Sequence, residues 1–211
     1  MREFSLQDRL ITHLDRALRT LAAEPRSVRP TPGAEAAEEV VDDTQRRHVA
    51  ALMRINHTGE ICAQALYQGQ AITARDETAR ESLEKAADEE TEHLAWTLGR
   101  IREMGGRTSL LNPLWYGGSL AIGVAAGIAG DRWSLGFLAE TERQVGAHLH
   151  SHLEKIPGGD GRSRAILEQM HTDETGHAQM AERLGGAELP APARLAMRLA
   201  SKMMTTLTYR V

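Results

Sequence analysis

The sequence is poor in cysteine and aromatic residues, and neither sign of charge dominates it. Its 211 residues include one cysteine, Cys62, which excludes an internal disulfide framework and favours a reducing compartment. The formal net charge of −4 leaves no basic footprint, so no nucleic-acid partner is expected. The N-terminus lacks a secretory signal, and Glu3, Asp8 and Asp15 argue against a transit peptide. Ala, Leu, Glu and Arg abound instead, which favours helices.

Strand-like alternation is also lacking, and helical periodicity takes its place. Leucines recur at steps of three and four in residues 4–21, and three prolines and a glycine then interrupt residues 24–35. Further helical stretches are expected at about 42–75, 76–104, 134–156, 162–184 and 189–209. The expected class is all-α, with four long helices as a bundle and additional N-terminal and C-terminal helices. The expected units are an N-terminal helix (1–23), a Pro-rich linker (24–41) and a bundle domain (42–211).

The run from Thr108 to Gly130 carries no charged residue, which raises the question of a membrane span. Asn112, Pro113 and several glycines lower its apolar density, so a true span is disfavoured. Two interpretations remain open. The run is either a Gly/Ala-rich helix packed in the core, or a segment that lies on a membrane surface with aromatic residues at its ends.

Two Glu-x-x-His motifs stand out, at Glu90–His93 and Glu174–His177. Residues three apart on a helix share a face, so each glutamate and its histidine point the same way. Both glutamates lie on apolar faces that should turn inward, and a buried carboxylate is costly unless it is paired or bound to a metal. The apolar neighbours are Leu83, Ala86, Ala87 and Leu94 around Glu90, and Leu167, Met170, Ala178 and Ala181 around Glu174.

A further glutamate precedes each motif at a similar distance. Glu60 comes 30 residues before Glu90, and Glu142 comes 32 residues before Glu174. Two single glutamates and two Glu-x-x-His motifs on four helices are the ligand set of a carboxylate-bridged di-metal site. Mixed oxygen and nitrogen ligands favour iron or manganese over a closed zinc site. The predicted metal ligands are Glu60, Glu90, His93, Glu142, Glu174 and His177.

Polar residues near these ligands are given other roles. Asn56 and Gln64 share the helical face of Glu60, so their amides are expected to orient the ligands. Glu89 and Glu92 fall off the apolar stripe of their helix and are expected to face solvent.

At these residues the chain resembles a known family, the demethoxyubiquinone hydroxylases of ubiquinone biosynthesis, and especially its bacterial members. The resemblance covers essentially the whole chain. It implies a ferritin-like di-iron monooxygenase in which the same six residues hold two iron ions. The implied substrate is a polyprenyl methoxy-methyl-1,4-benzoquinol, whose ring is hydroxylated with O₂ in the penultimate step towards ubiquinone. The motifs that carry it are LMRINHTGEICAQALYQGQA (52–71), EETEHLAWTLGRI, LAETERQVGAHLHSHL and MHTDETGHAQMA.

The resemblance also implies partners. The sequence lacks a glycine fingerprint for a nicotinamide or flavin cofactor, so electrons would come from outside the chain or from the quinol itself. The resemblance implies NADH as the external reductant. The isoprenoid tail of the substrate lies in a bilayer, so the expected location is peripheral, on the cytoplasmic side of a bacterial inner membrane. Accessory proteins of ubiquinone biosynthesis and a second copy of the chain are the other partners considered.

One position departs from the family pattern. Leu149 stands where animal relatives carry tyrosine, so an electron route through a ring there would need Tyr67 or Tyr209 instead. Two alternative functions also remain. Another ferritin-like redox protein, such as a manganese catalase, a peroxidase or an iron oxidase, would share the ligands. A purely structural scaffold would pair its inward acids with Arg or Lys, but Ala86 and Leu94 occupy the positions four residues from Glu90.

Overall fold

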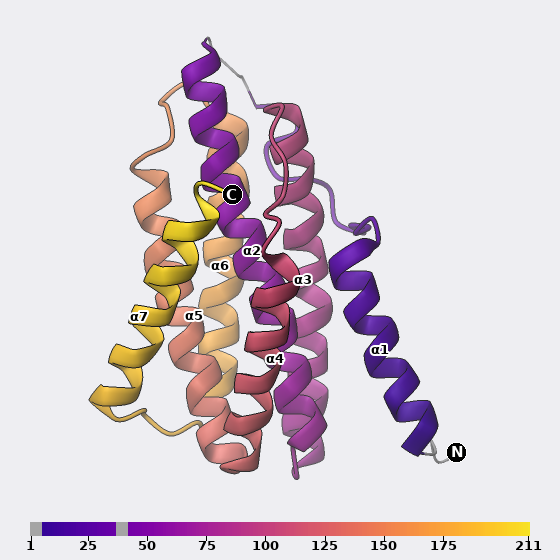
Figure 1. The fold of residues 1–211 in the computed structure, drawn as a ribbon. Coiled ribbons are helices and arrows are strands. Elements are labelled where there is room, and N and C mark those ends of the chain that lie inside the picture. The colour runs from indigo at the N-terminus through magenta and orange to yellow at the C-terminus, as the bar shows by residue number, and fades with distance from the viewer. Residues whose placement is uncertain (1–5, 37–41) are drawn as a thin grey trace.

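Helices are the only regular elements in the part of the chain that the structure, a computed structural model, describes (Figure 1). The described residues are 6–36 and 42–211, so Phe4 and residues 37–41 of the predicted linker lie outside them. The expected all-α class is confirmed. The helices are α1 (Leu6–Ala22), α2 (Asp43–Thr73), α3 (Glu77–Glu103), α4 (Asn112–Ile128), α5 (Asp131–Leu153), α6 (Gly161–Arg183) and α7 (Ala191–Thr208).

Short polar residues and glycines set the ends of the long helices. The side chains of Asp42, Asp76 and Asp160 accept hydrogen bonds from backbone N–H groups in the first turns of α2, α3 and α6. These contacts satisfy donors that have no partner within the helix. Gly105 and Gly185 follow the ends of α3 and α6 with φ of 71° and 89°, a conformation that favours glycine.

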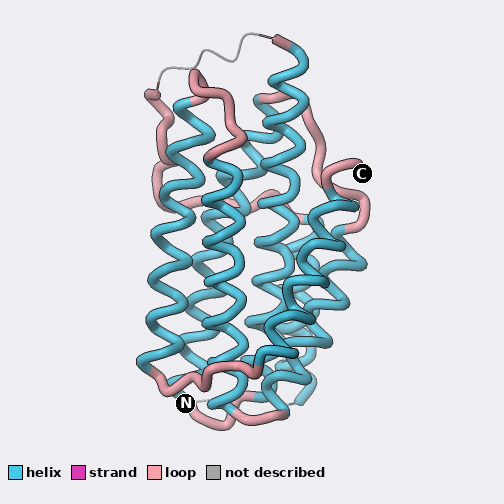
Figure 2. The backbone as a smooth tube through the Cα atoms, turned by 90° about the vertical axis from the view of Figure 1, so that its left-hand side faces the viewer, coloured by secondary structure: helices cyan, strands magenta, loops and turns pink. Residues whose placement is uncertain are grey.

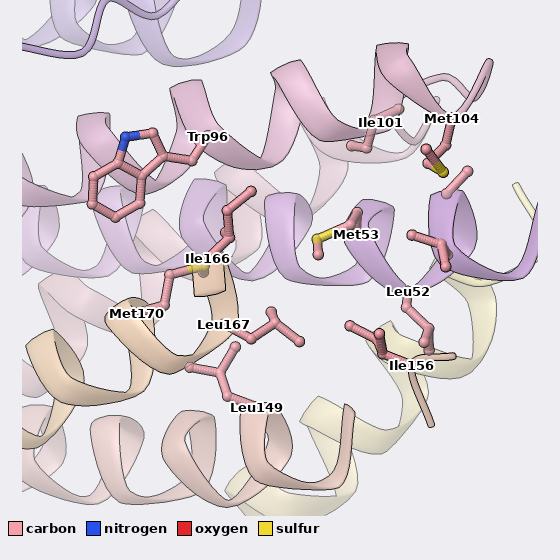
Figure 3. Close-up of a cluster of buried hydrophobic side chains, with 12 residues drawn as sticks. Leu52, Met53, Trp96, Ile101, Met104, Leu149, Ile156, Ile166, Leu167 and Met170 are labelled. Carbon is pink, nitrogen blue, oxygen red and sulfur yellow. The ribbon is translucent and has the colours of Figure 1, made fainter. Parts of the chain in front are cut away.

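The helices α2, α3, α5 and α6 form the bundle, in which α2 packs along α3 and α5 packs along α6. Figure 2 shows the long helices of the molecule running side by side. Apolar side chains from all four helices meet in one cluster, including Met53, Trp96, Leu149 and Leu167 (Figure 3). Leu149 is fully enclosed there. The position where animal relatives carry tyrosine is therefore part of the apolar core in this chain.

A second apolar cluster lies further along the same four helices, and the charged positions fall between the two. On α2, for example, Met53 belongs to one cluster, Tyr67 belongs to the other, and Glu60 lies between them. The same order holds on α3, α5 and α6. The bundle thus holds a polar layer between two apolar layers, which exclude water from it.

The uncharged run forms α4, which lies along α2 through a face of small residues. A Cβ atom added at Gly123 would lie 2.3 Å from the Leu66 carbonyl oxygen, so the two backbones approach more closely than a side chain allows. The opposite face of α4 is exposed to solvent. The expectation of a helix packed in the core is therefore confirmed for one face of α4 only. Exposed apolar residues of this face are Leu114, Ile122 and Ile128. No helix among the described residues has the length and hydropathy to cross a membrane.

The outermost helices α1 and α7 also leave apolar side chains in solvent. They lie on opposite outer sides of the bundle in Figure 1, coloured indigo and yellow. Contiguous exposed apolar surface of this kind marks a contact with a membrane or another protein. The exposed residues are Ile11, Leu14 and Leu18 on α1, and Leu195, Leu199, Met203 and Leu207 on α7.

Candidate metal centre

The polar layer brings the six predicted ligands together, and all six are buried. Their ligand atoms form two groups, each with all its atoms within 4.8 Å of one another. Glu90 and Glu174 belong to both groups, so these two carboxylates lie between two metal-sized positions. The first group is Glu60, Glu90, His93 and Glu174, and the second is Glu90, Glu142, Glu174 and His177.

Each histidine directs its Nδ1 atom towards the two central carboxylates. His93 Nδ1 lies 2.8 Å from Glu90 Oε2 and 3.3 Å from Glu174 Oε1. His177 Nδ1 lies 3.1 Å from Glu174 Oε2 and 3.4 Å from Glu90 Oε1. The two Glu-x-x-His motifs therefore make equivalent contacts and are related by an internal pseudo-two-fold symmetry.

The outer nitrogen of each histidine bonds an acid from the other motif. His93 Nε2 on α3 lies 2.9 Å from Asp173 Oδ2 on α6, and His177 Nε2 on α6 lies 2.7 Å from Glu89 Oε2 on α3. An Nε2–H that donates to a carboxylate leaves Nδ1 as the atom available to a metal, and it fixes the ring orientation.

Sequence reasoning missed both of these acids. The signal was present, because an acid directly precedes the glutamate of each Glu-x-x-His motif, as Glu89-Glu90 and Asp173-Glu174. The expectation that Glu89 faces solvent is partly correct. Its side chain is 40% exposed, yet its carboxylate holds the outer nitrogen of His177.

The expectation that Glu92 faces solvent is wrong. Its carboxylate accepts hydrogen bonds from the backbone N–H groups of Val28 and Arg29 and from the Ser27 hydroxyl, and the residue is buried. Burial follows because the Pro-rich segment returns across α3 and covers this face of the helix. A contact between segments about sixty positions apart leaves no trace in the periodicity of α3.

The expected role of Asn56 and Gln64 is also wrong, because their amides bond elsewhere. The Asn56 Oδ1 atom lies 2.9 Å from His152 Nδ1. The Gln64 amide donates to the Ala87 carbonyl and the Thr91 hydroxyl. Both residues link neighbouring helices.

Electrostatics of the polar layer fit a site that binds cations. Burial, followed by the charge of a neighbouring glutamate, raises the pKa of Glu60 and of Glu142 well above the usual value. Burial alone would also raise the pKa of Glu90, but His93 and His177 outweigh it and lower that pKa. Burial opposes protonation of His177, yet the adjoining carboxylates raise its pKa to about 12. Without a metal, protons bound to Glu60, Glu142 and His177 therefore neutralise part of the negative charge of the layer.

The carboxylates and imidazoles of the six residues fit two metal ions. The buried Oε1 atom of Glu142 has no hydrogen-bond partner, and the Oε1 atoms of Glu90 and Glu174 have only a histidine Nδ1 atom nearby, at 3.4 and 3.3 Å. Buried oxygens of this kind are costly unless a ligand satisfies them. Four carboxylates neutralise two divalent cations, and the two imidazoles complete an oxygen-rich set that suits iron or manganese. The cluster can hold metal at both positions.

Comparisons with known proteins show which family this chain is similar to. Residues 47–208 match the family model described as "Ubiquinone biosynthesis protein COQ7". A relative from Azoarcus sp. (strain BH72), named 3-demethoxyubiquinol 3-hydroxylase, is 66% identical over 204 residues, which cover 97% of this chain and 99% of the relative. Proteins of the same name from Chromobacterium violaceum and Dechloromonas aromatica are 63% and 62% identical, over 97% and 96% of this chain and 99% and 98% of the relatives. The chain belongs to the COQ7 family of ubiquinone biosynthesis proteins.

Proposed function

We propose that this chain hydroxylates the ring of 3-demethoxyubiquinol, a polyprenyl methoxy-methyl-1,4-benzoquinol, as a di-iron monooxygenase in the penultimate step of ubiquinone biosynthesis. The observation that carries the proposal is the buried layer of four glutamates and two histidines, in a chain of this family. One atom of O₂ would enter the ring and the other would leave as water, with two electrons supplied by an external reductant, NADH.

The proposed iron ligands are the six clustered residues. Glu60 and His93 would hold one ion, Glu142 and His177 the other, and Glu90 and Glu174 would lie between them. When bound, the two iron ions would supply the activation of O₂ that the ring C–H bond requires.

The protein's own contribution is orientation and exclusion of water. Asp173 and Glu89 fix the two imidazole rings through their outer nitrogens. The apolar layers on either side of the ligands keep solvent from the centre, which strengthens electrostatic interactions within it.

The exposed apolar faces of α1, α4 and α7 support a peripheral location at a membrane. We place it on the cytoplasmic side of a bacterial inner membrane because the relatives are bacterial proteins of ubiquinone biosynthesis. The isoprenoid tail of the substrate would remain in that membrane while the ring reaches the bundle. The same faces could also receive an accessory protein or a second copy of the chain. We assign residues 42–211 as the di-iron domain, preceded by the helix of residues 1–23 and the Pro-rich segment of residues 24–41.

A labelled-oxygen assay tests the reaction. The full chain would be loaded anaerobically with Fe(II), mixed with a short-tailed demethoxyquinone and NADH, and exposed to ¹⁸O₂. Mass spectrometry should show a product with one labelled oxygen atom, and Glu90→Ala should abolish it. Glu168→Ala, which removes an exposed acid from α6, is the matched control and should retain the product.

The alternatives predict different results. An iron-loaded protein that consumes peroxide or oxidises Fe(II), but leaves the quinone ring unchanged in detergent and in vesicles, would contradict the proposal. That result would instead favour a peroxidase, a manganese catalase or an iron oxidase on the same ligands.

A further inference from the structure

A cavity lies away from the metal centre, where the N-terminal half of α2 faces the loop after α3 and the C-terminal end of the chain. Its volume is about 710 Å³, and none of the six candidate metal ligands lines it. Figure 1 shows the C-terminal end beside α2 at this place. We call it the arginine pocket, and its polar lining includes Arg47, His48, Arg54, Arg107 and Tyr209.

The pocket concentrates positive charge, because three arginines line it. Among the described residues, no acidic group lies within ion-pair distance of Arg47, Arg54 or Arg107, whereas arginines elsewhere, such as Arg100 and Arg143, have acidic partners. This concentration is unexpected in a chain whose formal net charge is −4. Three neighbouring cations without a counter-charge repel one another, and an anion would relieve that repulsion.

Backbone contacts hold the central arginine in place. Arg54 Nε donates to the Arg107 carbonyl oxygen at 2.7 Å, and Arg54 Nη1 donates to the Tyr209 carbonyl oxygen at 3.3 Å. The Tyr209 hydroxyl lies 3.0 Å from His48 Nδ1, on the same wall. Burial and the nearby charge of Arg107 lower the pKa of Arg54, as expected for a guanidinium without an anionic partner. These contacts fix the side chains of Arg54, His48 and Tyr209 before a ligand arrives, whereas Arg47 and Arg107 are exposed.

We propose that the arginine pocket binds a phosphate group. Arginine is suited to phosphate because its planar fork donates two parallel hydrogen bonds, and the volume lies within the range of ligand sites. The phosphate could belong to the headgroup of an anionic phospholipid or to a soluble phosphate compound. Leu110 and Leu207, which lie three residues after Arg107 and two before Tyr209 in the chain, are exposed, and exposed apolar residues close in sequence to the pocket would suit a lipid.

The test uses Arg47→Gln/Arg107→Gln in the full chain, because these side chains do not hold the backbone as Arg54 does. The matched control is Arg26→Gln/Arg183→Gln, which removes the same charge from exposed arginines outside the pocket. Circular dichroism and thermal unfolding would confirm that both variants fold. Calorimetric titration with pyrophosphate measures the soluble source. Flotation with vesicles of phosphatidylcholine, with and without phosphatidylglycerol, measures the lipid source.

Loss of both arginines should weaken binding about 25-fold, since each contributes about fivefold next to an anionic surface. A loss in the pyrophosphate titration identifies a soluble phosphate compound as a ligand. A loss confined to vesicles that contain phosphatidylglycerol identifies a lipid headgroup. The proposal is overturned if the wild-type chain binds neither probe, or if the control variant loses as much binding as the pocket variant. The inference does not depend on the hydroxylase reaction.

Discussion

Arg29 Nη2 lies 2.6 Å from Asp173 Oδ2, although the two residues are 144 positions apart in the chain. The same guanidinium lies 4.5 Å from the centre of the Trp96 ring, and the backbone around Arg29 is bonded to Glu92. Asp173 in turn bonds the outer nitrogen of His93. The Pro-rich segment is thus connected to a candidate metal ligand through a single carboxylate.

This connection predicts that Arg29→Gln weakens metal binding without unfolding the bundle. Asp173 would lose a charged partner and would hold His93 less firmly, so the affinity for Co(II), a spectroscopic substitute for Fe(II), should fall about threefold to tenfold. The visible absorption of bound Co(II) measures the affinity. Arg26→Gln removes an exposed arginine from the same segment and should bind Co(II) like the wild-type chain. Equal affinities of the two variants would show that Arg29 has no such role.

The crossed histidine contacts give a stronger prediction. Asp173→Asn and Glu89→Gln should each lower metal affinity by about tenfold to a hundredfold, because each replaces the charged carboxylate partner of an imidazole with a neutral amide that is a weaker acceptor. The exposed acids Glu168 and Asp88, changed to Gln and Asn, are the matched controls on the same two helices. If the control variants weaken metal binding as much as Asp173→Asn and Glu89→Gln do, the effect would come from the loss of surface charge alone.

Four of the six clustered residues could be predicted from local signals, because each Glu-x-x-His motif lies within one helix and the apolar neighbours of Glu90 and Glu174 indicate which face turns inward. Glu60 could be predicted only from the repeat, since it precedes its motif by 30 residues where Glu142 precedes the other by 32. The contacts of Asp173 and Glu89 depend on how α3 pairs with α6, which no single helix encodes. The burial of Glu92 depends on the return of the Pro-rich segment, whose proline content indicates only that a helix ends.

The same limit applies to α4. From its lack of charge, both a core helix and a surface helix were compatible with the sequence. The periodicity of small and apolar residues does not indicate which face contacts a neighbouring helix. The structure resolves this through the glycines, which allow close approach to α2 on one side only. The bulky residues are left on the other side.

The glycine face of α4 predicts opposite outcomes for two similar substitutions. Gly123→Ala places a methyl group against the Leu66 carbonyl oxygen and should lower the free energy of unfolding by about 1–3 kcal/mol. Gly118→Ala adds a methyl group where nothing lies within 4 Å, and it should stabilise the helix by about 0.5–1 kcal/mol. Urea unfolding of both variants measures the difference. A Gly123→Ala variant as stable as Gly118→Ala would contradict the close packing of α4 on α2.

Buried His57 predicts that stability falls with acidity. Burial lowers its pKa from 6.5 to about 4, and its Nδ1 lies 3.1 Å from the Thr97 hydroxyl oxygen. Between these two pKa values the unfolded chain binds more protons than the folded chain, so the free energy of unfolding decreases as the pH falls. Above pH 6.5 both states are neutral and the contribution vanishes. The loss across the whole window is of order 3 kcal/mol.

Urea unfolding at pH 7 and pH 5 measures this effect as a difference between variants. His57→Gln removes the titrating group, so its stability should fall less between the two pH values than that of the wild-type chain. The exposed His150, changed to Gln, is the matched control. An identical fall in the wild-type chain and in His57→Gln would mean that His57 does not resist protonation in the folded state.

The crossed contacts of the two histidines have a consequence for the internal repeat. A fragment of α2 and α3 contains His93 but lacks the acid that orients it, and it contains Glu89 but lacks the histidine that Glu89 orients. A fragment of α5 and α6 contains His177 and Asp173 but lacks their partners, Glu89 and His93. Neither helix pair is a complete metal-binding unit, and two copies of one pair could complete each other only across a subunit interface. This chain carries the equivalent of that interface within a single polypeptide.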